Sequence, residues 1–528
     1  MKKSLPILNY IDPGFLSFLQ LIFWTTFLCF RFLFLALRFL FFSLLPALFQ
    51  PADPNEKNAP VLARGSRWGS SSFEQLFPRP ITARGYSGHQ LVFGLPGVGK
   101  TNFALAAMRG DLQHRRSFVF IDPHADAFRQ VLAAVIHAGY DPRDVLILDP
   151  DPVARLFGCP GLNLLHSEGH ERFEIVSEVL GVFRELWSDA FGPRTESLMR
   201  SCALALSEAG LTLGEAELFL TNAAFRSAIL QEISDHEVKH FWTQHFDSLR
   251  ESEQHVWTEA PRNKLSNLLG SEYVRALFSQ QSTVNLADFL NQPGRVILIN
   301  ASPHLRDSQR MFAALCLAKI WEAIYSRESL PPDKRIPVSI YADEAGAYLT
   351  TSCLRMLAES RKFACALKLF AQSPLQYGPH ADILFGTAGT VISFAVDHKA
   401  AEVLARQLFL FYGDRLPKQG ESDFLFGTKR KPYQFLSIHE EQQRALNSLM
   451  TMPKGACVIR IRGEDDPDPW VANIPLVTVP PLDPGREEEW RRENAAVFCR
   501  SLPDIAQERQ QRIDPFLHQP PPPFRNRS

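Results

Sequence analysis

The segment GLPGVGKT, Gly94 to Thr101, has the residue types and spacing needed to hold a phosphate chain. It matches G-x-x-x-x-G-K-[ST], in which glycines let backbone N–H groups turn toward phosphate oxygens. Lys100 is expected to reach the β- and γ-phosphates and Thr101 to ligate Mg²⁺. An apolar run precedes the loop and a helical pattern follows it, so the helix N-terminus adds a favourable dipole. The segment predicts a site for a nucleoside triphosphate with Mg²⁺.

A second motif, YADEAG at residues 341–346, places Asp343 and Glu344 directly after an apolar run. Asp343 is predicted to hold Mg²⁺ through water, and Glu344 to orient or activate the attacking water. The alternative is an acidic turn at the end of a strand. Asp122 and His124 also follow an apolar run, and strand C-termini face the ligand crevice in open α/β sheets. For these two residues, lining the site and capping a turn both remain open.

Arg361 and Gln372 are two further candidates, and the residues alone leave their roles open. Arg361 lies 18 positions after Asp343 on a predicted helix, and Gln372 ends the next strand-like run. An arginine in this place could serve a neighbouring subunit's nucleotide, or it could form a surface ion pair. The glutamine could sense the γ-phosphate and nearby nucleic acid, or it could be an ordinary hydrogen-bonding residue.

Hydrophobic patterns predict the elements that position these residues. Most of the short apolar runs are nearly continuous, as expected for strands buried on both faces of a parallel sheet. The runs begin at Leu91, Ser117, Asp144, Arg295, Val338, Ala366, Thr390 and Ala456. Their alternation with helices breaks between residues 165 and 290. There, apolar residues at i, i+3 and i+4 predict an all-helical insertion of about one domain.

The two ends of the chain depart from this pattern. Residues 15–49 are apolar except for one glutamine, a few hydroxyl groups and two arginines. This exceeds the roughly 20 residues of a membrane helix. We expect a membrane anchor, either one span followed by an interfacial helix or two short spans. Residues 481–528 join a charge-rich part, where a short helix is expected, to a proline-rich part expected to be disordered.

Composition limits the class of partner only loosely. The 528 residues include 56 Lys and Arg and 57 Asp and Glu, for a net charge of −1. This balance argues against a uniformly basic surface for nucleic acid, although a local basic channel stays possible. The eight cysteines include no C-x-x-C pair, so neither a zinc site nor a disulfide framework is indicated.

Several segments together resemble the FtsK–HerA superfamily of DNA-pumping P-loop ATPases, and within it the type IV secretion coupling proteins with their conjugative DNA-transfer ATPases. The segments are GLPGVGKT, FIDPHAD, FGPRTESLMRSCALAL, YADEAG, ESRKFACALKLFAQSP and TAGTVISFAVD. The resemblance runs from about Gly88 to Ile474. The phosphate and acidic motifs are generic, whereas the Arg-Lys-Phe…Gln-Ser block and the Phe-Gly-Pro-Arg helix start are more specific. Thr387 departs from the family, whose members usually have Asn there.

The resemblance implies an α/β fold: a RecA-like P-loop NTPase with a mainly parallel central sheet, an all-helical insertion domain and an N-terminal membrane helix. It also implies ATP and Mg²⁺ as cofactors and a homo-hexamer around a central channel. The implied domains are a membrane anchor and linker at 1–56, a RecA-like ATPase domain at 57–164 and 291–480, a helical insertion at 165–290 and a tail at 481–528.

The resemblance assigns roles to the candidate residues. Lys100, Glu344, Arg361 and Gln372 would be catalytic, with Arg361 as an inter-subunit finger and Gln372 as a sensor. Thr101 and Asp343 would hold the metal. The residues predicted to contact the nucleotide are Gly94, Pro96, Gly97, Val98, Gly99, Lys100, Thr101 and Asn102.

The implied function is a membrane-anchored translocase that hydrolyses ATP to pump DNA, alone or with bound protein, toward a type IV secretion or conjugation channel. Channel proteins and relaxase-type substrate proteins would be its partners. It would lie at the bacterial inner membrane with its ATPase domain in the cytoplasm. Three alternatives stay open: an ATPase that recruits protein effectors, a HerA-like helicase, and a nucleotide-gated scaffold. Only about 35 residues separate the linker from the phosphate loop, too few for the β-barrel of HerA-type proteins, and a scaffold need not retain Glu344.

Overall fold

The computed structural model describes residues 61–68, 79–82, 88–166, 171–187, 191–413, 416, 435–463 and 468–517. All of them belong to one compact unit, Pro60–Ser528. The predicted membrane segment at residues 15–49 and the proline-rich end of the chain lie outside the described residues. Wherever the structure describes residues 61–517, no helix is long and apolar enough to cross a membrane. The membrane anchor therefore stays a prediction.

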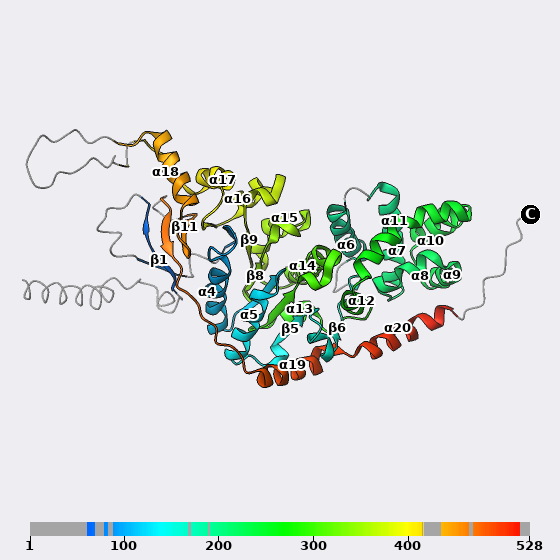
Figure 1. Ribbon diagram of the computed structural model, residues 1–528. Coiled ribbons are helices and arrows are strands. Elements are labelled where there is room, and N and C mark those ends of the chain that lie inside the picture. The colour runs from blue at the N-terminus through cyan, green and yellow to red at the C-terminus, as the bar shows by residue number, and fades with distance from the viewer. Residues whose placement is uncertain are drawn as a thin grey trace, which may run out of the picture. The chain divides into compact units, whose positions relative to one another are not determined.

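Eleven described strands form one sheet at the centre of this unit (Figure 1), in the order β2-β1-β12-β11-β10-β3-β9-β8-β4-β7-β5. The strands from β10 to β5 are parallel to one another. They are β10 (Thr390–Ser393), β3 (Gln90–Phe93), β9 (Cys365–Ala371), β8 (Val338–Ala342), β4 (Ser117–Asp122), β7 (Val296–Asn300) and β5 (Val145–Leu148). The antiparallel strands are β11 (Ala456–Ile461), β12 (Trp470–Asn473), β1 (Val61–Arg67) and β2 (Arg79–Thr82). A mixed α/β fold with a mostly parallel sheet, as predicted, is confirmed.

Helices cover both faces of the sheet, which explains why its central strands are nearly continuous in apolar residues. In β3, Leu91 and Phe93 belong to one core and Val92 to the other. Helices α4 and α5 contribute to the core around Val92, and α14 to α18 to the opposite core. The bounds are α4 (Lys100–Gln113), α5 (Asp126–His137), α14 (Gln309–Tyr325), α15 (Thr351–Glu359), α16 (Ala381–Thr387), α17 (His398–Leu408) and α18 (Ile438–Met450).

Helices fill the stretch between the short strand β6 (Cys159–Pro160) and β7, where the sequence predicts no strand. The helices are α6 (Arg172–Leu186), α7 (Pro193–Glu208), α8 (Ala216–Thr221), α9 (Ala223–Glu232), α10 (His236–His240), α11 (Glu251–Leu269), α12 (Glu272–Phe278) and α13 (Leu286–Leu290). We call them the helical segment. Their apolar residues join the same core as α14, so the segment packs on one face of the sheet.

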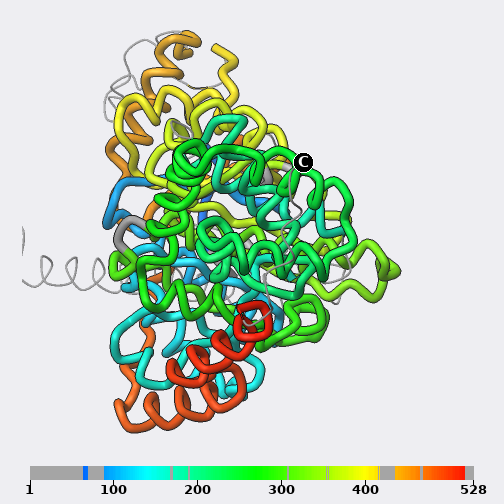
Figure 2. The backbone as a smooth tube through the Cα atoms, turned by 90° about the vertical axis from the view of Figure 1, so that its right-hand side faces the viewer, coloured from blue at the N-terminus to red at the C-terminus, as the bar shows by residue number. Residues whose placement is uncertain are grey.

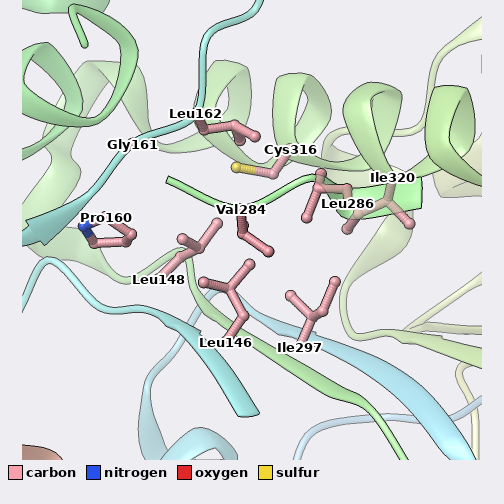
Figure 3. Close-up of a pocket in the computed structure, with 10 residues that line it drawn as sticks. All are labelled: Leu146, Leu148, Pro160, Gly161, Leu162, Val284, Leu286, Ile297, Cys316 and Ile320. Carbon is pink, nitrogen blue, oxygen red and sulfur yellow. The ribbon is translucent and has the colours of Figure 1, made fainter. Parts of the chain in front are cut away.

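The junction of the sheet with α14 is apolar and closely packed (Figure 3). Leu146 and Leu148 of β5 and Ile297 of β7 face Cys316 and Ile320 of α14. The space between them measures about 10 Å³. A cavity this small is at the lower limit for one water molecule. The junction therefore holds the two layers together and is not a ligand site.

The C-terminal segment is more helical than the sequence predicts. Helices α19 (Pro484–Phe498) and α20 (Leu502–Leu517) fill residues in which only a short helix is expected. Between them, β13 (Cys499–Arg500) pairs with β6. The segment runs from the sheet to the helical segment, where α20 packs against α9. Figures 1 and 2 show α19 and α20 in red as consecutive helices along the lower part of each view. Tertiary contacts along this path stabilise more helix than the charge-rich composition alone predicts.

Two arginines of α20 reach a carboxylate that is buried in the helical segment. Glu215 is fully buried and accepts hydrogen bonds from the Thr212 N–H at 2.8 Å and hydroxyl at 2.7 Å. Arg509 Nε and Arg512 Nη2 lie 3.2 and 3.4 Å from Glu215 Oε1. Arg512 Nη2 also donates to the Ser279 carbonyl at 2.6 Å. Since a buried carboxylate is costly without a cation, these contacts brace α20 on the helical segment.

Replacing Arg512 with Ala should destabilise the protein by about 2 kcal/mol, because Glu215 loses a cation and the Ser279 carbonyl loses a donor. Urea unfolding measures the change. The matched control is Arg492→Ala in α19, which breaks only an exposed ion pair with Glu488 and should have little effect. Equal effects of the two substitutions would contradict the bracing role.

Candidate nucleotide-binding site

The loop at residues 94–99 joins β3 to α4 with two glycines in conformations that other residues rarely adopt. Gly97 has a φ of +76° and Gly99 a φ of +124°. The Gly94 N–H donates to the Ala371 carbonyl at 3.2 Å, and the Leu95 N–H to the Ala395 carbonyl at 2.8 Å. The loop is therefore held from the strands on both sides of β3.

Lys100 is the first residue of α4, and its side chain folds back over the loop. Its Nζ donates to the Gly94 carbonyl at 2.5 Å and to the Leu95 carbonyl at 3.3 Å. Burial lowers the pKa of Lys100, and the charges of Glu344 and Asp343 act in the opposite direction. The lysine and the acidic pair thus lie close enough to interact electrostatically.

The strand order explains how distant residues meet here. β3, β9, β8 and β4 are adjacent and parallel, so their carboxyl ends lie at one edge of the sheet. β9 separates β3 from β8, which puts the loop and the acidic pair two strand spacings, about 10 Å, apart. Gln372 follows β9 and lies between them. Its Nε2 donates to Glu344 Oε1 at 3.1 Å.

Asp343 ionises less readily than an ordinary aspartate. Burial raises its pKa to about 6, the Asp122 and Glu344 carboxylates act in the same direction, and Lys100 opposes them. Its N–H continues the sheet ladder by donating to the Ile121 carbonyl at 3.0 Å. A divalent cation would relieve the repulsion among these carboxylates. The carboxylate of Asp343 and the hydroxyl of Thr101 are oxygen donors of the kind that Mg²⁺ prefers, so the residues fit such an ion.

Glu344 has a strained backbone, with φ 46° and ψ 39°. A residue other than glycine adopts this left-handed backbone conformation at a cost in free energy, and such residues cluster at functional sites. The Glu344 N–H donates to Asp343 Oδ1 at 3.1 Å, while the Glu344 side chain accepts from Gln372. The turn therefore places the consecutive carboxylates of Asp343 and Glu344 against different hydrogen-bond partners.

Asp122 combines the two roles that the sequence leaves open. Its Oδ1 accepts from the His124 N–H at 2.8 Å and its Oδ2 from the Phe128 N–H at 2.7 Å, so it caps α5. It is fully buried, and its charge also contributes to the raised pKa of Asp343. His124 supplies a backbone N–H to this cap, and its side chain is exposed.

Arg361 lies at the opposite edge of the sheet from the loop. It belongs to the short helix η13 (Ser360–Phe363), which precedes β9, and is about 20 Å from the carboxyl edge along this seven-residue strand. A Cβ on Gly88 or Gly389 would lie 3.2 or 3.3 Å from Arg361 Nη2. Arg361 therefore does not reach the loop of its own chain, and a role at another subunit's nucleotide stays a proposal.

Asn102 has hydrogen-bond partners away from the loop. Its Nδ2 donates to the Pro475 carbonyl at 2.9 Å, and its Oδ1 accepts from the Val477 N–H at 2.8 Å. These bonds fasten the first turn of α4 to the chain after β12. The side chain of this predicted nucleotide contact is thus already engaged in positioning the helix.

His89 is a residue that the sequence analysis missed. It precedes β3 and is buried; its Nδ1 accepts from the Leu367 N–H at 3.0 Å, and its Nε2 lies 3.3 Å from Ser360 Oγ. Burial, and then the charge of Arg361, lower its pKa to about 4. A neutral imidazole therefore ties β3 to β9. A single histidine before a strand carries no pattern that would reveal this role.

Solved structures of a conjugative coupling protein share this fold. TrwBdeltaN70 in its unbound monoclinic form matches 76% of this chain and 87% of its own, with a TM-score of 0.51 and 15% identity. The plasmid coupling protein TrwB in complex with GDPNP, and the same protein with ADP and Mg²⁺, each match 81% of this chain and 98% of their own, with TM-scores of 0.53 and 16% identity. No protein-family model and no curated protein matches the chain. The coupling-protein fold predicted from the resemblance is confirmed.

Replacing Asp343 with Asn should stabilise the nucleotide-free protein at pH 8. The pKa in the folded state, about 6, exceeds the ordinary 3.8, so the wild type loses stability as the pH rises between these values. The gain from Asn should be about 3 kcal/mol at pH 8 and about half of that at pH 5. Urea unfolding at both pH values tests this.

The exposed Asp333 offers a matched control, since Asp333→Asn should show no pH-dependent change. An Asp343→Asn protein less stable than the wild type at pH 8 would show that the carboxylates do not repel one another as described.

Proposed function

We propose that this chain is an ATPase that moves DNA toward a type IV secretion or conjugation channel. The observation that carries the proposal is the meeting of the phosphate-type loop, Lys100 and the Asp343–Glu344 pair at one sheet edge. The fold shared with the plasmid coupling protein TrwB, solved with ADP and Mg²⁺, supports it. In this proposal the chain forms a homo-hexamer, and residues 15–49 attach it to the bacterial inner membrane with the ATPase part in the cytoplasm.

The loop and Lys100 bind the phosphates. The N–H groups of the glycine-rich turn and of the first turn of α4 face the phosphate chain. Lys100 exchanges its bond with the Gly94 carbonyl for phosphate oxygens. Thr101 and Asp343 would hold Mg²⁺, which would neutralise charge on the β- and γ-phosphates. ATP binding thus replaces the hydrogen bond between the Lys100 side chain and the Gly94 carbonyl.

Glu344 orients and deprotonates the water that attacks the γ-phosphate. Gln372 Nε2 donates a hydrogen bond of 3.1 Å to Oε1 of this carboxylate, and Oε2 is left for the water. The backbone N–H of Gln372 donates to Gln376 Oε1 at 2.9 Å, which fixes the end of β9. A change at the γ-phosphate is therefore transmitted through Gln372 to β9, the role expected of a sensor.

Replacing Glu344 with Gln should lower kcat by at least about 100-fold, because the general base is lost. The Kd for ATP should change little, since the loop and Lys100 are untouched. Steady-state hydrolysis and equilibrium nucleotide binding measure the two effects. Glu359→Gln in α15 is the matched control and should keep wild-type kcat. If the Glu344→Gln protein turned over normally, Glu344 would not be the base.

DNA should stimulate ATP hydrolysis by the full chain in detergent, and the stimulation should fall steeply as salt rises from about 50 to 200 mM, because phosphate contacts release counterions. Lys100→Ala should abolish both basal and stimulated rates. The near-zero net charge also suits a chain that recruits protein effectors. That alternative predicts stimulation by protein substrates, insensitivity to salt, and no response to DNA.

A further inference from the structure

Three polar side chains meet in the core between α4 and the sheet, away from the atoms that would touch the nucleotide. Tyr341 of β8 donates its hydroxyl hydrogen to Asp111 Oδ2 of α4 at 2.6 Å. Lys368 of β9 donates to the Tyr341 hydroxyl at 2.6 Å and lies 3.8 Å from Asp111 Oδ2. All three residues are buried. We call them the α4 triad.

Burying the polar side chains of the α4 triad reduces the free energy of unfolding. Burial lowers the pKa of Lys368 and raises that of Tyr341, so the surroundings disfavour charge on both side chains. Apolar residues of similar volume in such a place are often as stable or more stable. The core cluster around the triad is built from apolar residues, with Phe103, Phe118 and Phe370 among its members. Ser339 also interacts with Tyr341, and the half-exposed Arg116 lies 3.8 Å from Asp111 Oδ1. Packing alone therefore does not explain why polar residues occupy it, whereas directional hydrogen bonds can fix one register between a helix and a sheet.

The triad connects the elements that carry the site. Asp111 lies 11 residues after Lys100, about three turns of α4, so both are on the same side of the helix. Tyr341 precedes Asp343 by two residues and Lys368 precedes Gln372 by four, so each pair shares one face of its strand. Tyr341 and Lys368 are also partners in the register of β8 and β9.

We propose that the α4 triad, Asp111, Tyr341 and Lys368, sets the position of α4 along the sheet and thereby holds Lys100 and Thr101 in register with Asp343 and Gln372. These are positioning residues, because none of them contacts the loop. An apolar interface would let α4 shift along the strands, whereas the Tyr341–Asp111 hydrogen bond and the Lys368–Asp111 ion pair, which both cross from the sheet to α4, permit one register. A displacement of about 1 Å between reacting groups can cost about 100-fold in rate. The inference rests on the proposed ATP hydrolysis.

The test replaces the whole triad with apolar residues in the full chain: Asp111→Leu, Tyr341→Phe and Lys368→Met together. Because no buried charge is left unpaired, the triple variant should unfold at a urea concentration equal to or above that of the wild type. Its kcat for ATP hydrolysis should fall by about 10-fold or more. The Kd for ATP should stay within about twofold, since the loop and Lys100 bind phosphates in either register.

A matched control removes a buried ion pair elsewhere. Lys319 and Glu322 of α14 form such a pair at 2.6 Å, and both are nearly buried. The double variant Lys319→Met and Glu322→Leu should keep wild-type kcat. A purely structural role for the triad predicts instead that stability changes while kcat of the folded protein does not.

A stable triple variant with wild-type kcat would overturn the proposal. If the triple variant does not fold, the single variant Tyr341→Phe tests the proposal instead. This change removes only the hydroxyl that bridges Asp111 and Lys368. The proposal requires that it lower kcat and leave KM unchanged. An inactive wild type would instead contradict the proposed ATPase function. An active wild type with an active, folded Tyr341→Phe protein would contradict the positioning role alone.

Discussion

Burial of the Asp343 carboxylate beside two other carboxylates, at the carboxyl edge of the sheet, is the constraint on which the candidate site depends. Asp122 and Asp343 are neighbours because β4 and β8 are adjacent and parallel, and Glu344 follows in the chain. The raised pKa of Asp343 expresses the cost of this arrangement. Lys100 reduces that cost from the side of the loop. The nucleotide-free site thus stores unfavourable electrostatic energy that a bound cation would release.

Such a site needs rigid surroundings, and β9 supplies them between the loop strand and the acidic strand. His89 binds the Leu367 N–H near the start of β9, Lys368 joins the α4 triad in its middle, and Gln372 reaches Glu344 at its end. Each bond comes from a different neighbouring element. β9 therefore aligns the strand that precedes the loop with the strand that precedes the acidic pair.

Local sequence patterns predict much of this fold. Each of the eight apolar runs identified in the sequence corresponds to a strand, and both the loop and the acidic pair follow strands as predicted. The position of β9 between β3 and β8 is not predictable in this way, because strand order is set by packing between distant segments. The strands β1, β2 and β12 also escape prediction, since none of them forms a long, continuous apolar run.

Individual charged residues are the harder part of the prediction. Asp111 and Lys368 resemble ordinary charges of a helix and a strand, and only the fold shows that they share a buried hydroxyl. Likewise, the arginines of α20 suggest a solvated surface until Glu215 is seen beneath them. In both cases the partner lies far away in sequence, so spacing along the chain contains no signal for the contact.

The pairing of β6 with β13 joins residues 159–160 to residues 499–500. On a ribosome, every strand of the large sheet emerges before α20 does. The helical segment therefore packs against α20 only after the strands of the large sheet have been synthesised. Glu215 meets Arg509 and Arg512 only at that stage. A chain that stops before α20 would have every strand of the large sheet but would leave Glu215 buried without these two arginines.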